Sequence, residues 1–292
     1  MRFPTVQRGG VAQGGTALPG RTGLADSEPV SARWLVDEPA AADARRVRLV
    51  LVRHGESTWN AEGRIQGHLG SGLSERGRAQ AADAAKRLHA LHPRVAVVTS
   101  SDLPRVIETA AAYTAVTAAV VDHDRRLREI DNGAWSGRTT AEVATAHPEQ
   151  IAAIRRGEDI PRGGGETFAQ LRARVDVALR DLARRVAGRV ARRAAGVDAP
   201  TEPTALVFTH GGPIRVAVAT ALRLPAGGHA LLEPPGNCSV TELSALVGTD
   251  GETLATTLVG YNHDPLDPAG PRTAADDVAA AGAPAGAAGR RA

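Results

Sequence analysis

Aromatic and sulfur-containing side chains are scarce in this sequence. Only 3% of the 292 residues are aromatic, and Cys238 is the single cysteine. One cysteine excludes an intramolecular disulfide and is typical of a reducing compartment, so we expect a cytoplasmic protein. Hydrophobic residues nevertheless make up 42% of the chain. This length and composition predict a full core that is built from aliphatic side chains and alanine.

Long apolar runs are missing too. No stretch approaches the roughly 20 apolar residues of a transmembrane helix, and no apolar segment follows Arg2 and Arg8, as a secretory signal would require. Lysine is nearly absent, because Lys86 is the only one among the 35 basic residues. The pI of 9.7 is high, but the net charge is only +3 and the arginines are scattered among acidic residues. We therefore expect neither a membrane nor a nucleic acid as a partner.

The two ends of the chain differ in composition from its middle. Residues 1–45 show no sustained period of 2 or 3.6, and residues 268–292 are a low-complexity stretch of alanine, glycine and proline. Both segments are predicted to be disordered extensions. No internal repeat divides the remainder, so residues 46–267 are predicted to form one domain.

Inside this domain, apolar runs alternate with helical patterns, which is typical of β-α-β units. The first run, VRLVLV, is apolar apart from Arg48, as expected of a strand that is buried on both faces. The predicted strands cover residues 47–52, 95–101, 118–122, 204–212, 238–247 and 253–260. The predicted helices cover residues 74–91 with Ser74 as N-cap, 103–115, 166–194 and a segment after 212. The fold class is therefore α/β, with a central, mostly parallel sheet.

Polar residues follow three of these strands, at Arg53-His54, Ser100-Ser101 and His210-Gly211. Ligands of open parallel sheets bind beyond the carboxyl ends of the strands, so the three strand ends are expected to meet at one site. A histidine in such a place serves as a nucleophile, as a metal ligand or only as a packed side chain. The residues of one strand end do not decide among these roles.

Further motifs along the domain indicate which of these roles the histidine has. The signature Arg53-His54-Gly55-Glu56 is followed, in order, by seven more blocks: Ser57-Thr58-Trp59-Asn60, Arg64-Ile65-Gln66-Gly67, Leu73-Ser74-Glu75-Arg76-Gly77, Ser101-Asp102-Leu103 with Arg105, Leu127-Arg128-Glu129, residues 163–166, and Phe208-Thr209-His210-Gly211-Gly212. This pattern resembles the histidine phosphatase superfamily, the phosphoglycerate-mutase-like proteins. The resemblance implies a three-layer sandwich in which helices flank the sheet on both faces.

The resemblance also implies a role for each of nine residues. They are His54 as nucleophile, Glu129 as general acid and base, Arg53, Arg105 and His210 as phosphate ligands, and Asn60, Gln66, Gly67 and Gly211 as further contacts to the substrate. The residue types suit that chemistry, because guanidinium groups match a phosphate dianion and a neutral imidazole nitrogen attacks phosphorus to form a covalent phosphohistidine. A glycine lets the backbone approach an anion closely.

Departures from the mutase pattern favour hydrolysis over phosphoryl re-donation. In the cofactor-dependent mutases an arginine follows the catalytic glutamate and a lysine lies some ten residues on, whereas this chain has Ile130 and Thr140 there, and Gly212 replaces an asparagine. Without these extra cations, water is the expected acceptor. The alternatives are a cofactor-dependent phosphoglycerate mutase and a non-catalytic relative that only binds a phosphorylated ligand. The last is disfavoured because a binding module has no need of Glu129.

No metal or cofactor is expected from the sequence. The triplet Asp122-His123-Asp124 contains ligand types, but adjacent strand residues point to opposite faces, and further ligands at known spacing are missing. Nucleotide-binding loops of the P-loop and Rossmann types are absent as well. The predicted partner is a small phosphorylated metabolite whose identity stays open, as does the oligomeric state, for which a homodimer is one option.

Overall fold

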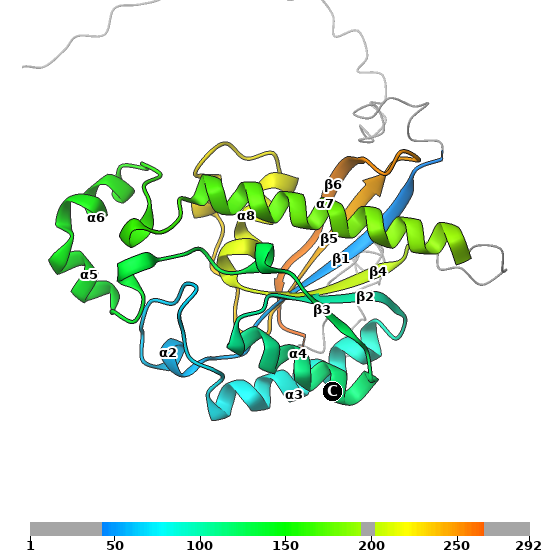
Figure 1. The fold of residues 1–292 in the computed structure, drawn as a ribbon, viewed down its shortest axis with the longest axis horizontal. Coiled ribbons are helices and arrows are strands. Elements are labelled where there is room, and N and C mark those ends of the chain that lie inside the picture. The colour runs from blue at the N-terminus through cyan, green and yellow to red at the C-terminus, as the bar shows by residue number, and fades with distance from the viewer. Residues whose placement is uncertain (1–42, 194–201, 266–292) are drawn as a thin grey trace, which may run out of the picture. The chain divides into compact units, whose positions relative to one another are not determined.

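The computed structural model describes residues 43–193 and 202–265. Their core is a six-stranded sheet with the order β3-β2-β4-β1-β5-β6 (Figure 1). Four neighbouring strands, β3, β2, β4 and β1, are parallel, while β5 runs antiparallel to β1 and β6 antiparallel to β5. The strands are β1 (Arg45–Arg53), β2 (Val95–Ser100), β3 (Val121–His123), β4 (Thr204–Thr209), β5 (Val240–Val247) and β6 (Thr253–His263).

Helices cover both faces of this sheet, as Figure 1 shows, with α7 and α8 on one face and α3 and α4 on the other. The helices are α2 (Thr58–Ala61), α3 (Glu75–Leu91), α4 (Pro104–Thr117), α5 (Thr140–Ala146), α6 (Pro148–Arg155), α7 (Phe168–Arg193) and α8 (Gly211–Ala221). Short 3₁₀ turns are η2 (Arg125–Leu127), η3 (Gly133–Trp135), η4 (Arg162–Gly164) and η5 (Gly228–Leu231). The predicted α/β sandwich is confirmed.

Residues 49–52 of β1 show why this part of the strand is apolar at every position. Leu49 and Leu51 pack into the core cluster under α7 and α8, whereas Val50 and Val52 pack into the cluster under α3 and α4. Successive side chains of a strand point to opposite faces, so a strand with helices on both sides buries all of them. The same holds for β4, in which every residue is buried.

Most predicted elements lie within a few residues of the observed ones. Ser74 caps α3 as expected, since its hydroxyl accepts the Gly77 amide at 3.0 Å. The third strand begins later than predicted, because α4 continues to Thr117 and Ala118 ends it in the left-handed conformation (φ 54°). Cys238 is also left-handed (φ 57°), so β5 starts at Val240 and not at 238.

Three helices, α2, α5 and α6, were not predicted. They have 4, 7 and 8 residues, too few for a clear apolar period, and local capping defines them. Thr139 and Glu142 form a capping box at α5, and Pro148 opens α6. Residues 1–42 of the extension that was predicted over residues 1–45 lie outside the described residues, and so does the predicted tail over 268–292. Within the described ranges no helix is long and apolar enough to cross a membrane.

Candidate active site

The carboxyl ends of the three central strands bring the predicted residues together. His54 follows β1, Ser101 follows β2 and His210 follows β4. The two imidazole rings are buried and lie edge to face, with their centroids 5.1 Å apart. The sheet therefore places the two histidines in one pocket, although 155 residues of chain separate them.

Hydrogen bonds on both ring nitrogens define the tautomer of His54. Its Nδ1 lies 2.7 Å from the carbonyl oxygen of Gly55, which only accepts, and its Nε2 lies 3.2 Å from Nε of Arg105, which only donates. The proton must then sit on Nδ1, which leaves a lone pair on Nε2. This is the arrangement that a nucleophilic histidine requires, with a backbone carbonyl orienting the ring.

Arg105 is almost fully buried beside that ring, at 1% exposure. It enters the pocket from the first turn of α4, and its Nη2 donates to the carbonyl of Gly67 at 3.0 Å. Burial lowers the pKa of Arg105 to about 10, which still leaves the guanidinium charged at neutral pH. Its Nη1 is buried and has no hydrogen-bond partner among the described residues.

Arg53 and His210 also present free nitrogens in the buried pocket. Arg53 donates through Nη1 to the carbonyl of Pro235, and His210 shares a 2.9 Å hydrogen bond between Nε2 and the Ser101 hydroxyl. Nε of Arg53 and Nδ1 of His210 lack a partner in the described part of the chain. Buried donors are normally paired, so these atoms together with Nη1 of Arg105 are suited to bind an anion.

Both pocket histidines are held neutral. Burial lowers the pKa of His54 well below its usual value, and the charges of Arg105 and Arg53 lower it further. Burial is also the main reason that the pKa of His210 is well below the ordinary value, followed by Arg105, His54 and Arg53. A neutral imidazole keeps the lone pair that attack on phosphorus needs.

Glu129 lies at the edge of the pocket with a defined carboxylate orientation. One oxygen accepts the amide of Ile130 at 2.9 Å, and the other accepts the amide of Gly212 at 3.2 Å. A Cβ at Gly212 would overlap the Glu129 carboxylate, so any other residue here would displace the carboxylate from this orientation. The amide at the start of α8 thus helps to aim the carboxylate.

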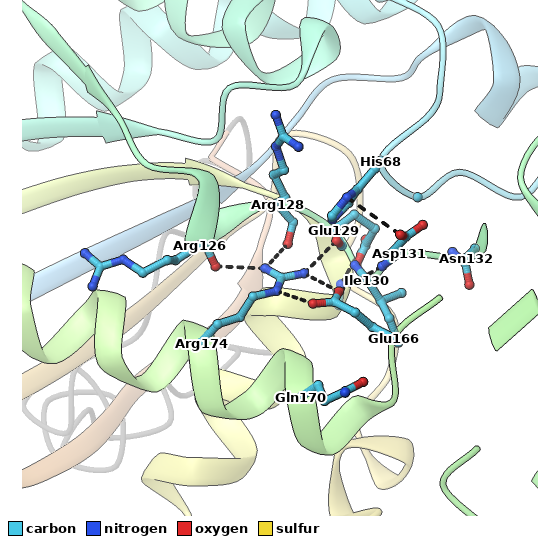
Figure 2. Close-up of polar contacts among 12 residues, drawn as sticks. His68, Arg126, Arg128, Glu129, Ile130, Asp131, Asn132, Glu166, Gln170 and Arg174 are labelled. Carbon is cyan, nitrogen blue, oxygen red and sulfur yellow. Dashed lines mark hydrogen bonds and ion pairs between the residues drawn. The ribbon is translucent and has the colours of Figure 1, made fainter. Parts of the chain in front are cut away.

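The backbone of the Glu129 segment is held by Arg174 of α7 (Figure 2). This side chain donates to the carbonyl oxygens of Arg126, Arg128 and Glu129 at 2.7–2.8 Å. It also pairs with both carboxylate oxygens of Glu166, and Glu166 in turn accepts the amide of Asp131 at 2.9 Å. Arg174 was not among the predicted site residues, since its only signal in the sequence is its place two helical turns after the residue 163–166 block.

Gln66 and Gly67, two of the predicted substrate contacts, lie next to Arg105. Gly67 gives Arg105 its carbonyl acceptor, and a Cβ at Gly67 would lie 2.7 Å from the amide nitrogen of Asn132. Gln66 lies beside Arg105 as well, because a Cβ at Gly70 would lie 2.7 Å from Nη1 of Arg105 and 2.9 Å from Oε1 of Gln66. Their contact with a substrate stays a prediction.

The other two predicted substrate contacts, Asn60 and Gly211, have different surroundings. Asn60 belongs to the capping box of α2, in which its Oδ1 accepts the Ser57 amide at 3.2 Å, so only its NH₂ group is left for a ligand. Gly211 opens α8, and a Cβ there would meet nothing closer than Nε of Arg53 at 3.8 Å. The fold itself therefore does not demand glycine at 211, whereas a side chain at 212 would displace the Glu129 carboxylate.

The acidic triplet 122–124 is engaged in ion pairs. Asp122 pairs with Arg185 at 3.1 Å, and Asp124 pairs with Arg126 at 2.8 Å. Across the described ranges, no group of three or more histidine, cysteine or carboxylate side chains is arranged to hold a metal ion.

The mixed α/β sheet and the pocket of two histidines and two arginines at the ends of its strands are typical of proteins that transfer phosphoryl groups. Comparison with known proteins supports this class. Residues 49–254 match the histidine phosphatase superfamily (branch 1), and the chain belongs to that family. The predictions of the family and of a histidine phosphatase enzyme are confirmed.

Curated relatives include phosphatases and a mutase. The chain is 39% identical over 222 residues to glucosyl-3-phosphoglycerate phosphatase of Mycobacterium tuberculosis, covering 75% of this chain and 95% of that protein. It is 35% identical over 204 residues to the metal-independent phosphoserine phosphatase of Arabidopsis thaliana, covering 68% and 78%. It is also 32% identical over 200 residues to a probable phosphoglycerate mutase of Salmonella choleraesuis, covering 68% and 84%.

A solved structure confirms the fold. The native structure of the mycobacterial glucosyl-3-phosphoglycerate phosphatase is similar with a TM-score of 0.63 and 34% identity, over 74% of this chain and 99% of that one.

Proposed function

We propose that the protein hydrolyses phosphomonoesters of small metabolites through a covalent phosphohistidine on His54. The observation that carries this proposal is the pair of hydrogen bonds on the ring, which puts the proton on Nδ1 and the lone pair on Nε2. A bound phosphate offers Arg105 a charged acceptor in place of Nε2. That exchange frees the lone pair for attack.

The first half of the reaction transfers the phosphoryl group to the enzyme. Nε2 of His54 forms a bond to phosphorus while the bond from phosphorus to the ester oxygen breaks. Glu129 donates its proton to the departing oxygen, so that an alcohol leaves and not an alkoxide. Nε of Arg53 and Nη1 of Arg105 neutralise the charge on the phosphoryl oxygens, and the neutral His210 donates a hydrogen bond to them from Nδ1.

The second half releases phosphate. Glu129, now a carboxylate, takes a proton from water as the water oxygen bonds to phosphorus and the phosphorus–nitrogen bond breaks. The proton is then on Glu129 again, and Nε2 regains its lone pair. Proton transfer by a positioned carboxyl group is worth roughly 10²–10⁴-fold in rate, so the contacts that orient Glu129 matter for both halves.

The second candidate is a mutase, which the similarity to a probable phosphoglycerate mutase favours. Water is the better-supported acceptor, because Ile130 and Thr140 stand where the mutases have cations that retain the substrate. Phosphatase relatives named for glucosyl-3-phosphoglycerate and phosphoserine support a small phosphorylated metabolite as substrate. Incubation with 3-phosphoglycerate, with and without bisphosphoglycerate, separates the two candidates by whether inorganic phosphate or 2-phosphoglycerate forms.

Acid-quench trapping tests the phosphohistidine. We expect ³²P-labelled substrate to leave acid-labile, base-stable label on the wild-type protein and on His89→Ala, whose histidine is exposed on α3. The variant His54→Ala should carry no label and show at least a 10³-fold lower kcat, because the nucleophile is lost. Equal labelling of His54→Ala would refute the assignment.

A further inference from the structure

Two arginines near Glu129, Arg162 and Arg215, are not used by the proposed chemistry. Arg215 lies three residues after Gly212 on α8, which places it on the same helix face as the amide that holds Glu129. Arg162 opens the η4 turn, whose loop is joined to the Glu129 segment by the 2.9 Å hydrogen bond from the Glu166 amide to the Asp131 carbonyl. Both arginines therefore belong to elements that border the catalytic carboxylate.

Phe168 and His229 connect the two arginines. Cζ of Arg162 lies 4.6 Å from the centre of the Phe168 ring. Phe168 stacks on His229 with 3.7 Å between the ring centroids, and Nε of Arg215 donates to the carbonyl of His229 at 3.0 Å. Packing thus fixes both arginines from one side, which limits the side-chain entropy that binding a ligand would cost.

No carboxylate of the described residues lies within salt-bridge distance of either guanidinium group, although Asp159 and Glu129 are near Arg162 and Arg215 respectively. Neither forms a salt bridge there, and Nε of Arg162 is buried without a hydrogen-bond partner. Asp159 is near Arg162, but its two oxygens already accept the Phe168 and Ala169 amides at 2.8 Å. His229 between them is not a counter-ion, because histidine carries no negative charge. Burial together with Arg215 and Arg162 lowers its pKa to about 4, so it is neutral at physiological pH. Two unpaired, half-buried cations are unfavourable until an anion joins them.

We propose that Arg162 and Arg215 form a carboxylate subsite for the leaving-group portion of the substrate, so that the enzyme selects phosphomonoesters that carry a carboxylate. The assignment rests on the proposed function. Glu129 protonates the ester oxygen, so cations beyond Glu129 meet the part of the substrate that departs as alcohol. A guanidinium fork matches the two oxygens of a carboxylate. These positions differ from those of the mutase cations, which are Ile130 and Thr140 in this chain.

A matched pair of substrates tests this subsite. 3-Phosphoglycerate and glycerol 3-phosphate are esters of the same three-carbon length, and they differ in whether a carboxylate or a hydroxymethyl group ends the chain. We expect wild-type kcat/KM to favour 3-phosphoglycerate by at least tenfold. In Arg162→Gln and Arg215→Gln this preference should fall about tenfold or more each, through a higher KM for 3-phosphoglycerate, because a charge-assisted hydrogen bond is lost. The rate with glycerol 3-phosphate should change less than threefold.

Controls separate a failed subsite from a failed fold or a failed enzyme. Arg180→Gln, on an exposed part of α7, should keep the wild-type preference. Arg162→Lys, which retains the charge, should recover part of it, and the thermal midpoint of each variant shows whether the protein still folds. Equal wild-type kcat/KM for the two esters, or an equal loss of both rates in the variants, would overturn the subsite while leaving the phosphatase intact. Absence of phosphohistidine on the wild type would instead overturn the proposed function.

Discussion

At the scale of single residues, the site depends on keeping two imidazoles uncharged beside permanent cations. His54 and His210 are buried next to Arg105, and each has a pKa well below the usual value. Arg105 stays charged at neutral pH despite burial, because its own pKa is about 10. The pocket is therefore positive without protonated histidine, which suits a phosphate dianion and also keeps the Nε2 lone pair of His54 that the proposed attack requires.

We predict that His54 and His210 remain neutral at pH 6, below the ordinary histidine pKa of about 6.5. Between the lowered pKa of the folded state and about pH 6.5, the unfolded chain binds protons at these histidines and the folded protein does not. The contribution of these groups to the free energy of unfolding is therefore fully present above about pH 6.5 and is lost progressively below it. Imidazole ¹⁵N chemical shifts measured between pH 5 and 8 report the charge directly. The exposed His89 serves as internal reference, and assignment uses His54→Asn and His210→Asn. A His54 midpoint at or above 6.5 would contradict the prediction.

At the scale of elements, the long helix α7 acts as a support for the loop that carries Glu129. Arg174 donates hydrogen bonds to three backbone carbonyls and to the Glu166 carboxylate, which joins them in one network (Figure 2). Periodicity predicted this helix and its buried face, because Leu171, Val175 and Leu182 recur at helical spacing. It could not predict Arg174, since an arginine on the polar side of a helix has the same pattern whether it faces water or a carbonyl cluster.

Substitution of Arg174 should impair catalysis through the position of Glu129. We expect Arg174→Gln to lower kcat for an alkyl phosphate at least tenfold, and to lower it much less for p-nitrophenyl phosphate, whose leaving group needs no protonation. Arg174→Lys should restore part of the activity with the alkyl ester. The exposed Arg180→Gln on the same helix is the matched control. A loss of equal size for both substrates would indicate a general structural effect and contradict the positioning role.

At the scale of the whole molecule, the sequence predicts the sheet, the flanking helices and the meeting of strand ends, because these follow from buried apolar runs and the rule for parallel strands. His54, Arg105 and His210 were found through motif order, and the structure places them within one pocket. The arginines at 162, 174 and 215 were not found, because contacts between distant segments give them their surroundings. The short helices α2, α5 and α6 were not predicted, because capping rather than periodicity defines them.

The electrostatics of the whole site predict that catalysis needs no metal ion. Arg53 and Arg105 supply fixed positive charge at the phosphate, where Mg²⁺ bridges the oxygens in many phosphoryl-transfer enzymes. The described residues contain no cluster of three or more side chains suited to hold such an ion. We therefore expect kcat and KM to change less than twofold after dialysis against EDTA, measured with a phosphomonoester that wild type turns over. A two-metal phosphatase treated in parallel should lose its activity. A loss in this protein that Mg²⁺ restores would refute a mechanism in which the chain's own guanidinium groups neutralise the phosphoryl charge.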